Sequence, residues 1–406
     1  MRSKSDKKKS LVPRLRFPEF REAGAWEVKR LGEVCDVLDN LRKPVARTKR
    51  NPGPYPYYGA SGAIDYIDQY IFDERLLLIG EDGAKWLPYE KTAFIVEGQY
   101  WVNNHAHVLR PTLAIDTLLE NYLTALDISQ HITGAAPPKL TLDNLRLIWV
   151  PLPPKWDEQQ KIAHCLSSLD EVMGLQAKKV QALKQHKKGL MQQLFPAEGE
   201  TTPRLRFPEF REAVAWEVKE LIKLAGRGTE RNQKGKIKRV LTNSAEHGVL
   251  DQREYFDKDI AIQGNLENYF VVDQGDFVYN PRISSFAPVG PISRNDVGKG
   301  VMSPLYTVFS FRQSDTDFFA HYFNSSAWHS YMRKVGSTGA RHDRMAISNS
   351  DFLAMPLSVP NPKEQQKIAH CLSSLDEVIG LESHKLDALK NLKKGLMQQL
   401  FPQEVA

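Results

Sequence analysis

The chain has 406 residues, of which 41% are hydrophobic and 26% are charged, and its formal net charge is +6. This composition is typical of a globular chain with roughly two to four structural units. The longest apolar runs, such as residues 76–79, are too short for a membrane span, and the N-terminus lacks the apolar core of a signal peptide. We therefore expect a cytoplasmic protein without membrane segments, whose mild positive charge permits an anionic partner without requiring one.

The first elements in the chain are a tail and a repeated cassette. Residues 1–12 are rich in Lys and Ser, and we predict a disordered basic tail. The cassette at residues 13–31 returns 190 residues later, at residues 203–221, with 17 of its 19 positions identical. Glu19 and Lys29 imitate part of a metal-dependent nuclease motif, but the aromatic content of the cassette favours a packing arm.

A divergent module follows each cassette. Short β-like runs, such as residues 92–96, 107–109, 276–279 and 305–311, alternate with Gly, Pro and Asn turns. Each module also has one helical patch near its end, at residues 115–126 and 316–332. We expect two α+β modules with a shared frame and different faces, at residues 13–155 and 203–361, with a linker at 197–202 and a short tail at 403–406.

A basic, turn-rich stretch recurs after each cassette, at residues 42–50 and 232–240, again 190 residues apart. A solvated charged loop is the plainer interpretation of one such stretch. Recurrence in otherwise divergent modules favours contact with DNA phosphates, which positions a protein without reading sequence.

Base readout needs short amides, hydroxyls, Arg and aromatic side chains on loops, and both modules supply them. Turn formation is the alternative explanation for most of these residues. The predicted DNA-binding residues are Lys43, Arg47, Lys49, Tyr57, Tyr58, Ser61, Asn103, Asn104, His105 and Lys139 in the first module, and Lys236, Lys238, Asn243, Arg282, Ser284, Ser337, Arg341 and Arg344 in the second.

Each module is followed by a long predicted helix, at residues 156–196 and 362–402. The stretches 158–196 and 364–402 are identical at 31 of 39 positions. Asn361 and Glu364 form a capping-box pattern around Pro362, and Pro196 and Pro402 close the helices. About 38 helical residues at ~1.5 Å each predict a rod of about 57 Å.

Apolar residues in both helices follow steps of four and three, the heptad pattern of a coiled coil. Polar residues interrupt the pattern at matching places, which suggests that the two helices pair with each other. The predicted seam comprises Ile162, Leu166, Leu169, Met173, Val180, Leu183, Leu190 and Leu194 in the first helix, and Ile368, Leu372, Leu375, Ile379, Leu386, Leu389, Leu396 and Leu400 in the second.

No catalytic or metal-binding constellation is found. Residues 51–55 differ by an extra glycine from the loop with which amino-methyltransferases hold a target amine, and residues 228–236 lack the spacing of a phosphate loop. His105 and His107 would share one face of a strand, but no Cys or carboxylate cluster completes a metal site. Cys165 and Cys371 are equivalent positions that we interpret as small packed side chains.

From residue 13 to residue 402 the chain resembles the specificity subunits of type I restriction-modification systems. The similar parts are the two Glu-Gln-Gln-Lys-Ile-Ala helices that end in Gly-Leu-Met-Gln-Gln-Leu-Phe, the preceding Pro-Leu-Pro-Pro and Val-Pro-Asn-Pro runs, the Trp-Glu-Val-Lys segments and the run Gly-Asp-Phe-Val-Tyr-Asn at residues 275–280. The resemblance implies two target-recognition domains separated by two long antiparallel helices. Each domain would read one half of a split DNA site.

The resemblance also implies a prokaryotic, DNA-associated subunit without its own active site, cofactor or metal. Two methyltransferase subunits with S-adenosylmethionine would dock on the helices, which act as a ruler, and restriction subunits would use ATP and Mg²⁺. A 57 Å rod limits the gap to about 17 base pairs, and we expect half-site centres about one DNA turn apart, ~34 to 36 Å. The alternatives are a self-contained DNA methyltransferase or nuclease, and a coiled-coil scaffold for protein interactions.

Overall fold

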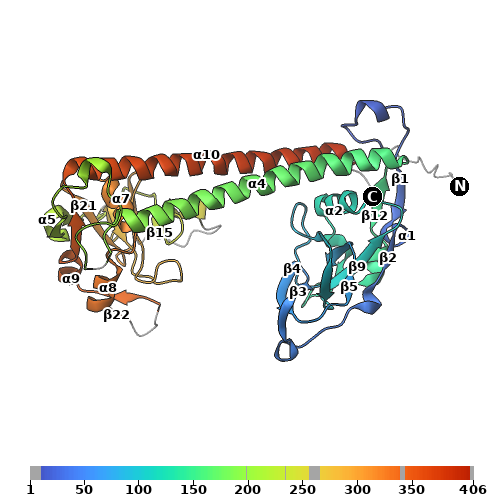
Figure 1. Cartoon of the computed structure of the whole chain (residues 1–406), viewed down its shortest axis with the longest axis horizontal. Helices are drawn as coiled ribbons and strands as arrows, with labels where there is room; N and C mark the ends of the chain where they lie inside the picture. The colour runs from blue at the N-terminus through green and yellow to red at the C-terminus, as the bar shows by residue number, and fades with distance from the viewer. Residues whose placement is uncertain (1–10, 198, 234, 256–265, 339–342, 403–406) are drawn as a thin grey trace. The chain divides into compact units, whose positions relative to one another are not determined.

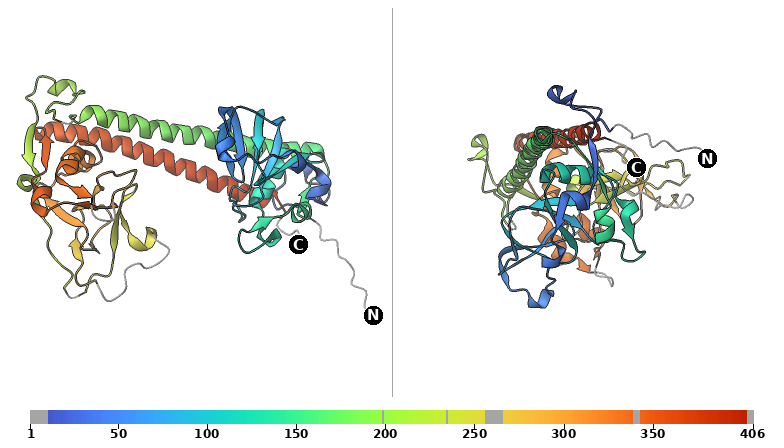
Figure 2. Two further views of the ribbon diagram at one scale, coloured as in Figure 1. Left: turned by 90° about the horizontal axis from the view of Figure 1, so that it is seen from below. Right: turned by 90° about the vertical axis from the view of Figure 1, so that its right-hand side faces the viewer.

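The computed structural model describes residues 11–197, 199–233, 235–255, 266–338 and 343–402. The chain divides into two compact units, unit 1 with Met1–Lys179 and Glu382–Ala406, and unit 2 with Val180–Leu381. The long helices α4 (Trp156–Leu194) and α10 (Pro362–Leu400) run side by side and contribute to both units (Figure 1, Figure 2).

Two four-stranded sheets form the centre of unit 1. The strand order of the first is β2-β9-β6-β7, with antiparallel neighbours; its strands are Cys35–Val37, Ala106–Pro111, Leu76–Gly80 and Ala93–Val96. The second has the order β4-β3-β8-β5, in which β3 and β8 are parallel; its strands are Gly62–Ile67, Pro52–Gly59, Gln99–Val102 and Phe72–Asp73. Strand β6 is buried along its whole length, as its unbroken apolar run predicts.

Smaller elements complete unit 1. Strand β1 (Glu27–Arg30) pairs with β12 (Trp149–Leu152), and β10 (Ile132–Thr133) pairs with β11 (Lys139–Leu140). The short helices are α1 (Leu31–Val34), α2 (Asp116–Ala125) and α3 (Leu142–Arg146), with 3₁₀ turns at Pro18–Phe20, Asp39–Leu41, Arg47–Lys49 and Ser129–His131.

Unit 2 repeats this frame. Its four-stranded sheet has the order β14-β21-β18-β19, with strands Ala225–Arg227, Thr307–Phe311, Phe277–Tyr279 and Ile292–Arg294. The remaining strand pairs are β13 (Glu217–Glu220) with β24 (Pro356–Val359), β15 (Leu241–Ser244) with β16 (Gly248–Asp251), β17 (Phe270–Val272) with β20 (Gly300–Met302), and β22 (Ser337–Thr338) with β23 (Met345–Ala346). The short helices are α5 (Leu221–Leu224), α6 (Gln252–Tyr255), α7 (Asp317–Phe323), α8 (His329–Val335) and α9 (Asn349–Leu353), with a 3₁₀ turn at Pro208–Phe210.

The structure confirms two α+β modules on a common frame and a pair of long helices in contact. The predicted single helix at residues 316–332 is wrong, because two helices, α7 and α8, occupy this region. Between them, the Ser325 hydroxyl donates to the Tyr322 carbonyl at 2.6 Å, and the Trp328 indole N–H donates to the Phe323 carbonyl at 3.1 Å. These side chains satisfy the last carbonyls of α7 and so end the helix.

Each unit builds its core on the start of one long helix and the end of the other. Ile162 and Leu166 of α4 join Met397 and Leu400 of α10 in the core of unit 1. The equivalent residues of unit 2 are Ile368 and Leu372, with Met191 and Leu194. Every predicted seam residue is buried or half-buried.

The polar interruptions of the seam meet across the helix pair. Gln176 and Glu382 are equivalent positions of the repeat, and the Gln176 amide donates to the Glu382 carboxylate at 2.6 Å. Lys179 joins the same carboxylate at 2.5 Å. A polar layer of this kind favours one register of a coiled coil over its alternatives.

The repeated cassette is fastened to the long helices by a buried ion pair. The Arg16 guanidinium donates two hydrogen bonds to the Glu158 carboxylate, both at 2.7 Å, and the Trp26 indole N–H donates to the same carboxylate at 3.3 Å. Both charged side chains are almost fully buried. Lys161 and Glu19, one turn away, form a further ion pair at 3.3 Å, so the cassette is the packing arm that its composition predicts.

Unit 2 contains the same arrangement. Arg206 donates two bonds to Glu364 at 2.7 and 2.8 Å, and Trp216 donates at 3.3 Å. The Asn361 side chain caps α10 by accepting from the backbone N–H of Glu364 at 3.1 Å, as predicted. The predicted return bond of a capping box is replaced, because the Glu364 carboxylate accepts from Arg206 and Trp216 instead.

The ends of the domains require one correction. The predicted disordered tail at residues 1–12 reaches too far, since Leu11 is buried in the core of unit 1 and its carbonyl accepts from the Trp26 backbone N–H at 2.8 Å. Residues 1–10 and the predicted tail at 403–406 lie outside the described residues. In the described ranges, no helix is both long enough and apolar enough to cross a membrane.

Candidate nucleic-acid interface

Two turns of unit 1 lie against each other and carry several of the predicted DNA-binding residues. The β3–β4 turn carries Ser61, and the β8–β9 turn carries Asn104 and His105. The Asn103 backbone N–H donates to the Tyr58 carbonyl at 3.1 Å, which joins the two turns. Ser61, Asn104 and His105 are exposed, so the structure gathers them on one solvent-facing surface.

The β8–β9 turn is held in a defined shape. The Asn103 side-chain oxygen accepts from the His105 backbone N–H at 2.8 Å, and the His105 Nδ1 lies 2.5 Å from the Asp82 carboxylate. The His105 side chain is nevertheless 49% exposed. Its second ring nitrogen is therefore available to a ligand.

A network of mostly buried charged side chains lies next to these turns, on the side away from solvent. Arg42 contacts the carboxylates of Asp39, at 3.1 Å, and Glu81, at 2.5 Å, and Lys139 contacts Glu81 at 2.6 Å. The His107 ring lies 2.6 Å from the Asp39 carboxylate and 2.8 Å from a backbone carbonyl. Both ring nitrogens of His107 therefore have a polar neighbour within hydrogen-bond distance.

The pKa values of the two carboxyl groups reflect this network. Burial opposes the ionisation of Glu81, but hydrogen bonds from Lys139 and Arg42 outweigh it and hold the pKa of this carboxyl below its usual range. Burial likewise opposes the ionisation of Asp39, while contacts from His107 and Arg42 lower its pKa overall. Both groups are therefore ionised at neutral pH.

Asp39, Glu81 and His107 place potential metal-ligating atoms within 4.8 Å of one another. Arg42 and Lys139 already occupy the carboxylate oxygens, and two cations in contact with the cluster oppose a third. The cluster is therefore a structural support for the turns. Lys139 remains 43% exposed, so one side of it faces solvent.

The basic stretch of unit 1 packs against the second sheet. The side chains of Lys43, Arg47 and Lys49 are exposed, and no ion pair forms at any of them within the described ranges. Arg50 anchors the stretch, because its guanidinium lies 4.2 Å from the Tyr57 ring centroid and 3.0 Å from the Asp65 carboxylate. Three cations are thus held on a fixed segment with their charges directed to solvent.

In unit 2, three segments meet around residues 280–287. The Asn280 side chain donates to the Asn243 carbonyl at 2.9 Å, and the Ile283 backbone N–H donates to the Asp343 carbonyl at 3.0 Å. Arg282 and Arg344 form an isolated β-bridge. The loop therefore brings Arg282, which is exposed, beside Arg344, which is half-buried.

The tip of this loop presents a residue that sequence reasoning missed. The Ser284 backbone N–H donates to the Ala287 carbonyl at 3.0 Å, and the Ala287 backbone N–H donates to the Ser284 hydroxyl at 3.1 Å. These bonds close the loop around an outward-facing Phe286 that is 70% exposed. Ser284 and Ser337 are exposed as well. The sequence clue to this residue was an aromatic side chain inside a polar, turn-rich loop. Exposed aromatic rings of this kind can contact base edges and thymine methyl groups.

Three predicted contacts need correction. The side chain of Tyr57 is 0% exposed, that of Asn103 is 3% exposed and that of Asn243 is 2% exposed. Tyr57 and Asn103 hold neighbouring turns in place, and the Asn243 amide donates to the Val278 carbonyl at 2.7 Å. Their buried side chains do not reach a ligand at the surface. Arg341 lies outside the described residues, and Tyr58 is half-buried against aromatic rings.

The basic loop of unit 2 is separate from residues 280–287. Asn232 closes it, because its side chain bonds both the N–H and the carbonyl of Ile237, and Lys236 and Lys238 are exposed. Asn280 packs against Asn243 of β15, which lies five residues after Lys238, about 17 Å along an extended chain. The basic loop and the loop of Arg282 therefore contact different parts of the chain around β15.

Residues 24–185 and 222–391 match the family model of the type I restriction modification DNA specificity domain. The chain belongs to the specificity subunits of type I restriction-modification systems. The specificity subunit of the type I restriction enzyme MjaVIII from Methanocaldococcus jannaschii is 23% identical over 420 residues, which cover 95% of this chain and 93% of that protein. A specificity subunit from Haemophilus influenzae is 36% identical over 134 residues, which cover 33% of this chain and 34% of that protein.

Solved structures show the same fold. The type I S subunit from M. genitalium aligns with a TM-score of 0.59 and 13% identity, over 97% of this chain and 100% of that one. A chain from a structural study of complex assembly and conformational transition in the type I system aligns with a TM-score of 0.51 and 17% identity, over 94% and 98% of the two chains. The specificity subunit is non-catalytic, and its two matched segments are DNA-recognition domains. This assignment replaces the alternatives of a self-contained methyltransferase or nuclease and of a general coiled-coil scaffold.

Proposed function

We propose that this specificity subunit reads an asymmetric, bipartite DNA site, with one recognition domain on each half-site. The observation that carries the proposal is that two units with the same frame present different loops. Unit 1 offers Ser61, Asn104 and His105, whereas unit 2 offers Arg282 and Ser284. Arg favours the acceptor pair of guanine, and Asn favours adenine, so the two loops select different bases.

Phosphate contacts would fix the position of each domain on DNA. Lys43, Arg47 and Lys49 supply exposed positive charge in unit 1, and Lys236 and Lys238 do so in unit 2. We assign these residues to the DNA backbone. Their charges carry no sequence information but release counterions, so DNA affinity falls as salt rises.

Lys139 and Arg344 are assigned to the border of each recognition loop. Lys139 binds Glu81 with one side of its ammonium group and is 43% exposed on the other. The Arg344 side chain is 39% exposed, and its guanidinium lies 4.0 Å from Asp343. Glu81 would orient the Lys139 ammonium group, and Asp343 would orient the Arg344 guanidinium, before DNA binds.

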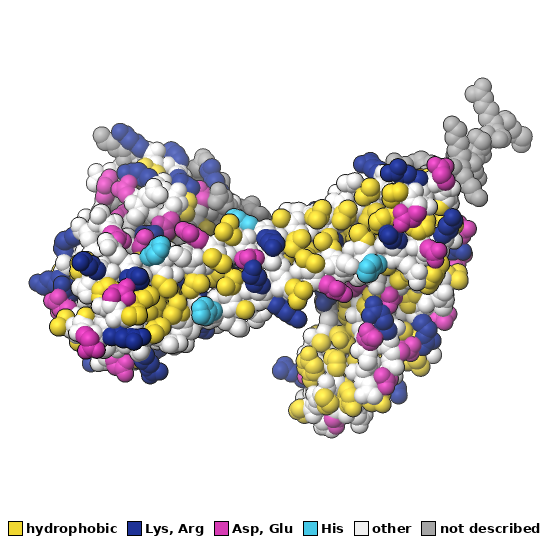
Figure 3. Space-filling view, turned by 45° about the horizontal axis from the view of Figure 1, so that its top comes forward, with side chains coloured by type: hydrophobic (Ala, Val, Ile, Leu, Met, Phe, Trp, Pro, Cys, Tyr) yellow, Lys and Arg dark blue, Asp and Glu magenta, His cyan; other side chains and the backbone are white. Residues whose placement is uncertain are grey.

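The helices carry an exposed apolar strip that fits a protein partner. In unit 1, Val172 is 47% and Leu175 is 67% exposed; in unit 2, the equivalent residues Val378 and Leu381 are 41% and 70% exposed. Hydrophobic side chains are also visible on the helix surface in Figure 3. Because the strip occurs once in each repeat, we propose that it docks two methyltransferase subunits, one per strip.

The chemistry then resides on the partners. We propose that modification subunits bind S-adenosylmethionine and methylate adenine, and that restriction subunits use ATP and Mg²⁺. The specificity subunit would bring both to DNA in the cytoplasm of a prokaryotic cell.

The proposal is tested by altering one recognition loop at a time. In the assembled methyltransferase, Asn104→Ala with His105→Ala should relax or abolish recognition of one half-site, and Arg282→Ala with Ser284→Ala should do so for the other, since a lost bidentate contact costs about 1 to 3 kcal/mol of discrimination. Sequencing of methylated DNA gives the readout. Changes in both half-sites from either pair, or in neither, would refute one domain per half-site.

A further inference from the structure

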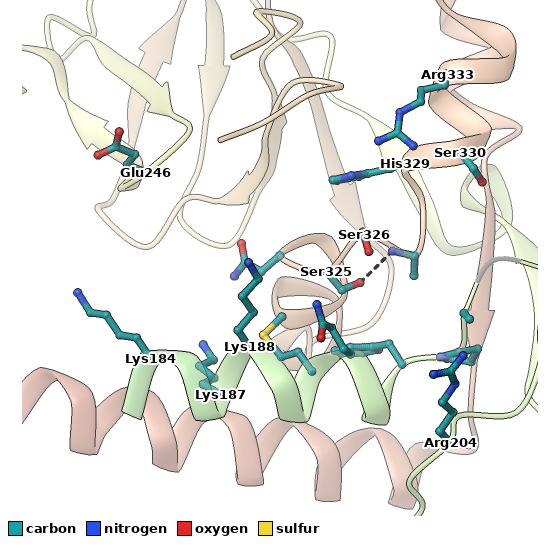
Figure 4. A pocket seen from close by; sticks show the side chains of 17 residues that line it. Lys184, Lys187, Lys188, Arg204, Glu246, Ser325, Ser326, His329, Ser330 and Arg333 are labelled. Atoms are coloured by element: carbon teal, nitrogen blue, oxygen red, sulfur yellow. Dashed lines mark hydrogen bonds between the residues drawn. The ribbon is translucent and has the colours of Figure 1, made fainter. Parts of the chain in front are cut away.

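A basic groove in unit 2 is not explained by the recognition loops. It has a volume of about 920 Å³ and lies between the C-terminal part of α4 and the segment that contains the α7–α8 turn and α8 (Figure 4). Lys184 and Lys188 project from α4 into it, and Arg333 faces them from α8, with Arg204 at one end.

The charge of this groove is largely uncompensated. Among the described residues, no carboxylate forms an ion pair with Lys184, Lys188, Arg204 or Arg333, whereas Lys187 is paired with Asp376 at 2.5 Å. Glu246 is the one acidic residue among those that line the groove in the described ranges, and Figure 4 shows it across from α4. Four cations therefore face a cavity that contains one carboxylate.

The remaining lining groups suit an anion. Asn324 and Ser326 of the α7–α8 turn and Ser330 of α8 add amide and hydroxyl groups that can donate hydrogen bonds, whereas the Ser325 hydroxyl donates to the Tyr322 carbonyl. Burial of the His329 ring, together with the nearby charge of Arg333, lowers the pKa of this histidine to about 4. His329 is therefore neutral at pH 7, and the positive charge belongs to Lys and Arg.

The equivalent lysines of unit 1 have partners. Lys390 and Lys394 are the counterparts of Lys184 and Lys188 in the repeat. Lys390 pairs with Asp387 at 2.9 Å, and Lys394 lies 4.6 Å from the centroid of the Tyr89 ring. The counterpart of Asp387 is Gln181, so Lys184 has lost this partner. Within the described residues, Lys184 and Lys188 therefore lack the contacts that their counterparts in unit 1 make.

The shape and position of the groove favour DNA over other anions. Sites for small molecules are mostly apolar and bury their ligand, whereas this groove is partly open and 12 of its 17 lining residues are polar or charged. Glu246 belongs to the β15–β16 turn, and Asn243 on the same β15 contacts Asn280 at the start of the recognition loop. One strand thus connects the groove to the loop assigned to base readout.

We propose that this groove binds the phosphate backbone of DNA that flanks the half-site read by unit 2. The proposal rests on the DNA-recognition role of unit 2 and extends the footprint beyond the bases that are read. Lys184, Lys188, Arg204 and Arg333 would contact phosphate oxygens and therefore strengthen binding independently of sequence.

The test compares two matched double variants in the complex with modification subunits. Lys184→Ala with Lys188→Ala removes two charges from the groove, and Lys390→Ala with Lys394→Ala removes two charges from the equivalent place in unit 1. DNA affinity is measured at several salt concentrations, on duplexes with the recognised site and without it. We expect the slope of log affinity against log salt to become shallower by about two for the first variant on both duplexes, and to change little for the second.

Equal slopes for the first variant and the unaltered complex would overturn the proposal, as would equal effects of the two variants. Loss of a modification subunit from the first variant, seen by size-exclusion chromatography, would show that the groove docks protein and would also overturn it. Duplexes truncated next to the recognised half-site should abolish the difference between the first variant and the unaltered complex. Failure of the DNA-recognition role itself is distinguishable, because the unaltered complex would then show no preference for the recognised site.

Discussion

Glu158 and Glu364 explain why the two cassettes have stayed almost identical while the modules diverged. Each carboxylate is buried and accepts three hydrogen bonds, two from Arg and one from Trp. A change in one partner leaves another charge without its counterion in the interior, which costs more than a surface change. The cassette and the first turn of the helix must therefore change together.

Glu364→Gln should lower the free energy of unfolding by about 3 to 5 kcal/mol, because the Arg206 guanidinium stays buried without a counterion. Glu209→Gln is the matched control, since Glu209 pairs with Lys367 at the surface at 3.1 Å and its loss should have little effect. Denaturant unfolding of both variants gives the measurement. Equal stability of the two variants would contradict a role for the buried pair.

At the residue scale, sequence reasoning identified the kinds of side chain in the loops but not which of them reach the surface. Asn103 and Asn104 are adjacent and chemically identical, yet only Asn104 is exposed. The difference depends on the direction of each side chain within the β8–β9 turn, and residue type does not contain this information. Phe286 was missed for the reverse reason, because an apolar residue is expected to be inside.

At the scale of elements, the long helices were predictable because their signal extends over many turns. The heptad pattern, the proline stops and the matching polar interruptions all agree with the pairing of α4 and α10. The break between α7 and α8 was missed, because it depends on local hydrogen bonds from Ser325 and Trp328 rather than on periodicity. A heptad pattern repeats at every second turn of a long helix, so the evidence for the helix accumulates. A break between two short helices depends on one or two side chains and leaves no repeated pattern.

The contact between α7 and α10 makes unit 2 sensitive to acid. His321 Nε2 lies 3.0 Å from the Ser373 hydroxyl, and its Nδ1 has no hydrogen-bond partner in the described part of the chain. Burial, with a contribution from Lys187, lowers the pKa of His321 to about 4, against an ordinary value near 6.5. The folded state therefore favours the neutral ring.

Because the pKa is lower in the folded state, this contribution to stability is fully present above pH 6.5 and is lost as the pH falls from 6.5 toward 4. We expect the free energy of unfolding to drop by about 3 kcal/mol across this window through His321. His321→Gln should flatten the dependence, while His186→Gln on the exposed surface of α4 should leave it unchanged. Thermal unfolding at a series of pH values measures both, and identical profiles for His321→Gln and the unaltered chain would refute the assignment.

The apolar strips on the helices give a second prediction at this scale. Leu175→Glu and Leu381→Glu should each reduce the number of bound methyltransferase subunits from two to one, and the double variant should bind none. Both leucines are more than half exposed, so the changes should not unfold the helices. Native mass spectrometry counts the subunits, with Lys178→Glu as a charged control on the same helix. Two bound subunits in the double variant would show that docking occurs elsewhere.

At the scale of the whole molecule, a duplicated frame supports two recognition surfaces that no longer resemble each other. The sheet order β2-β9-β6-β7 recurs as β14-β21-β18-β19, so the positions of the loops are shared. The exposed polar and aromatic residues come from different places in the frame: Asn104 and His105 lie in the β8–β9 turn, whereas Arg282 and Phe286 lie in the loop after β18, the counterpart of β6. The repeats made this organisation visible in the sequence, whereas the bases read depend on loop conformations that no repeat encodes.

The most direct measurement of the central claim is a genome-wide map of adenine methylation in the source strain, with the gene present and with the gene deleted. We predict that deletion removes methylation from one split, asymmetric motif with a fixed gap, and that returning the gene restores it. An unchanged map in a strain whose methyltransferase subunits are expressed would contradict the claim that this chain directs methylation to DNA.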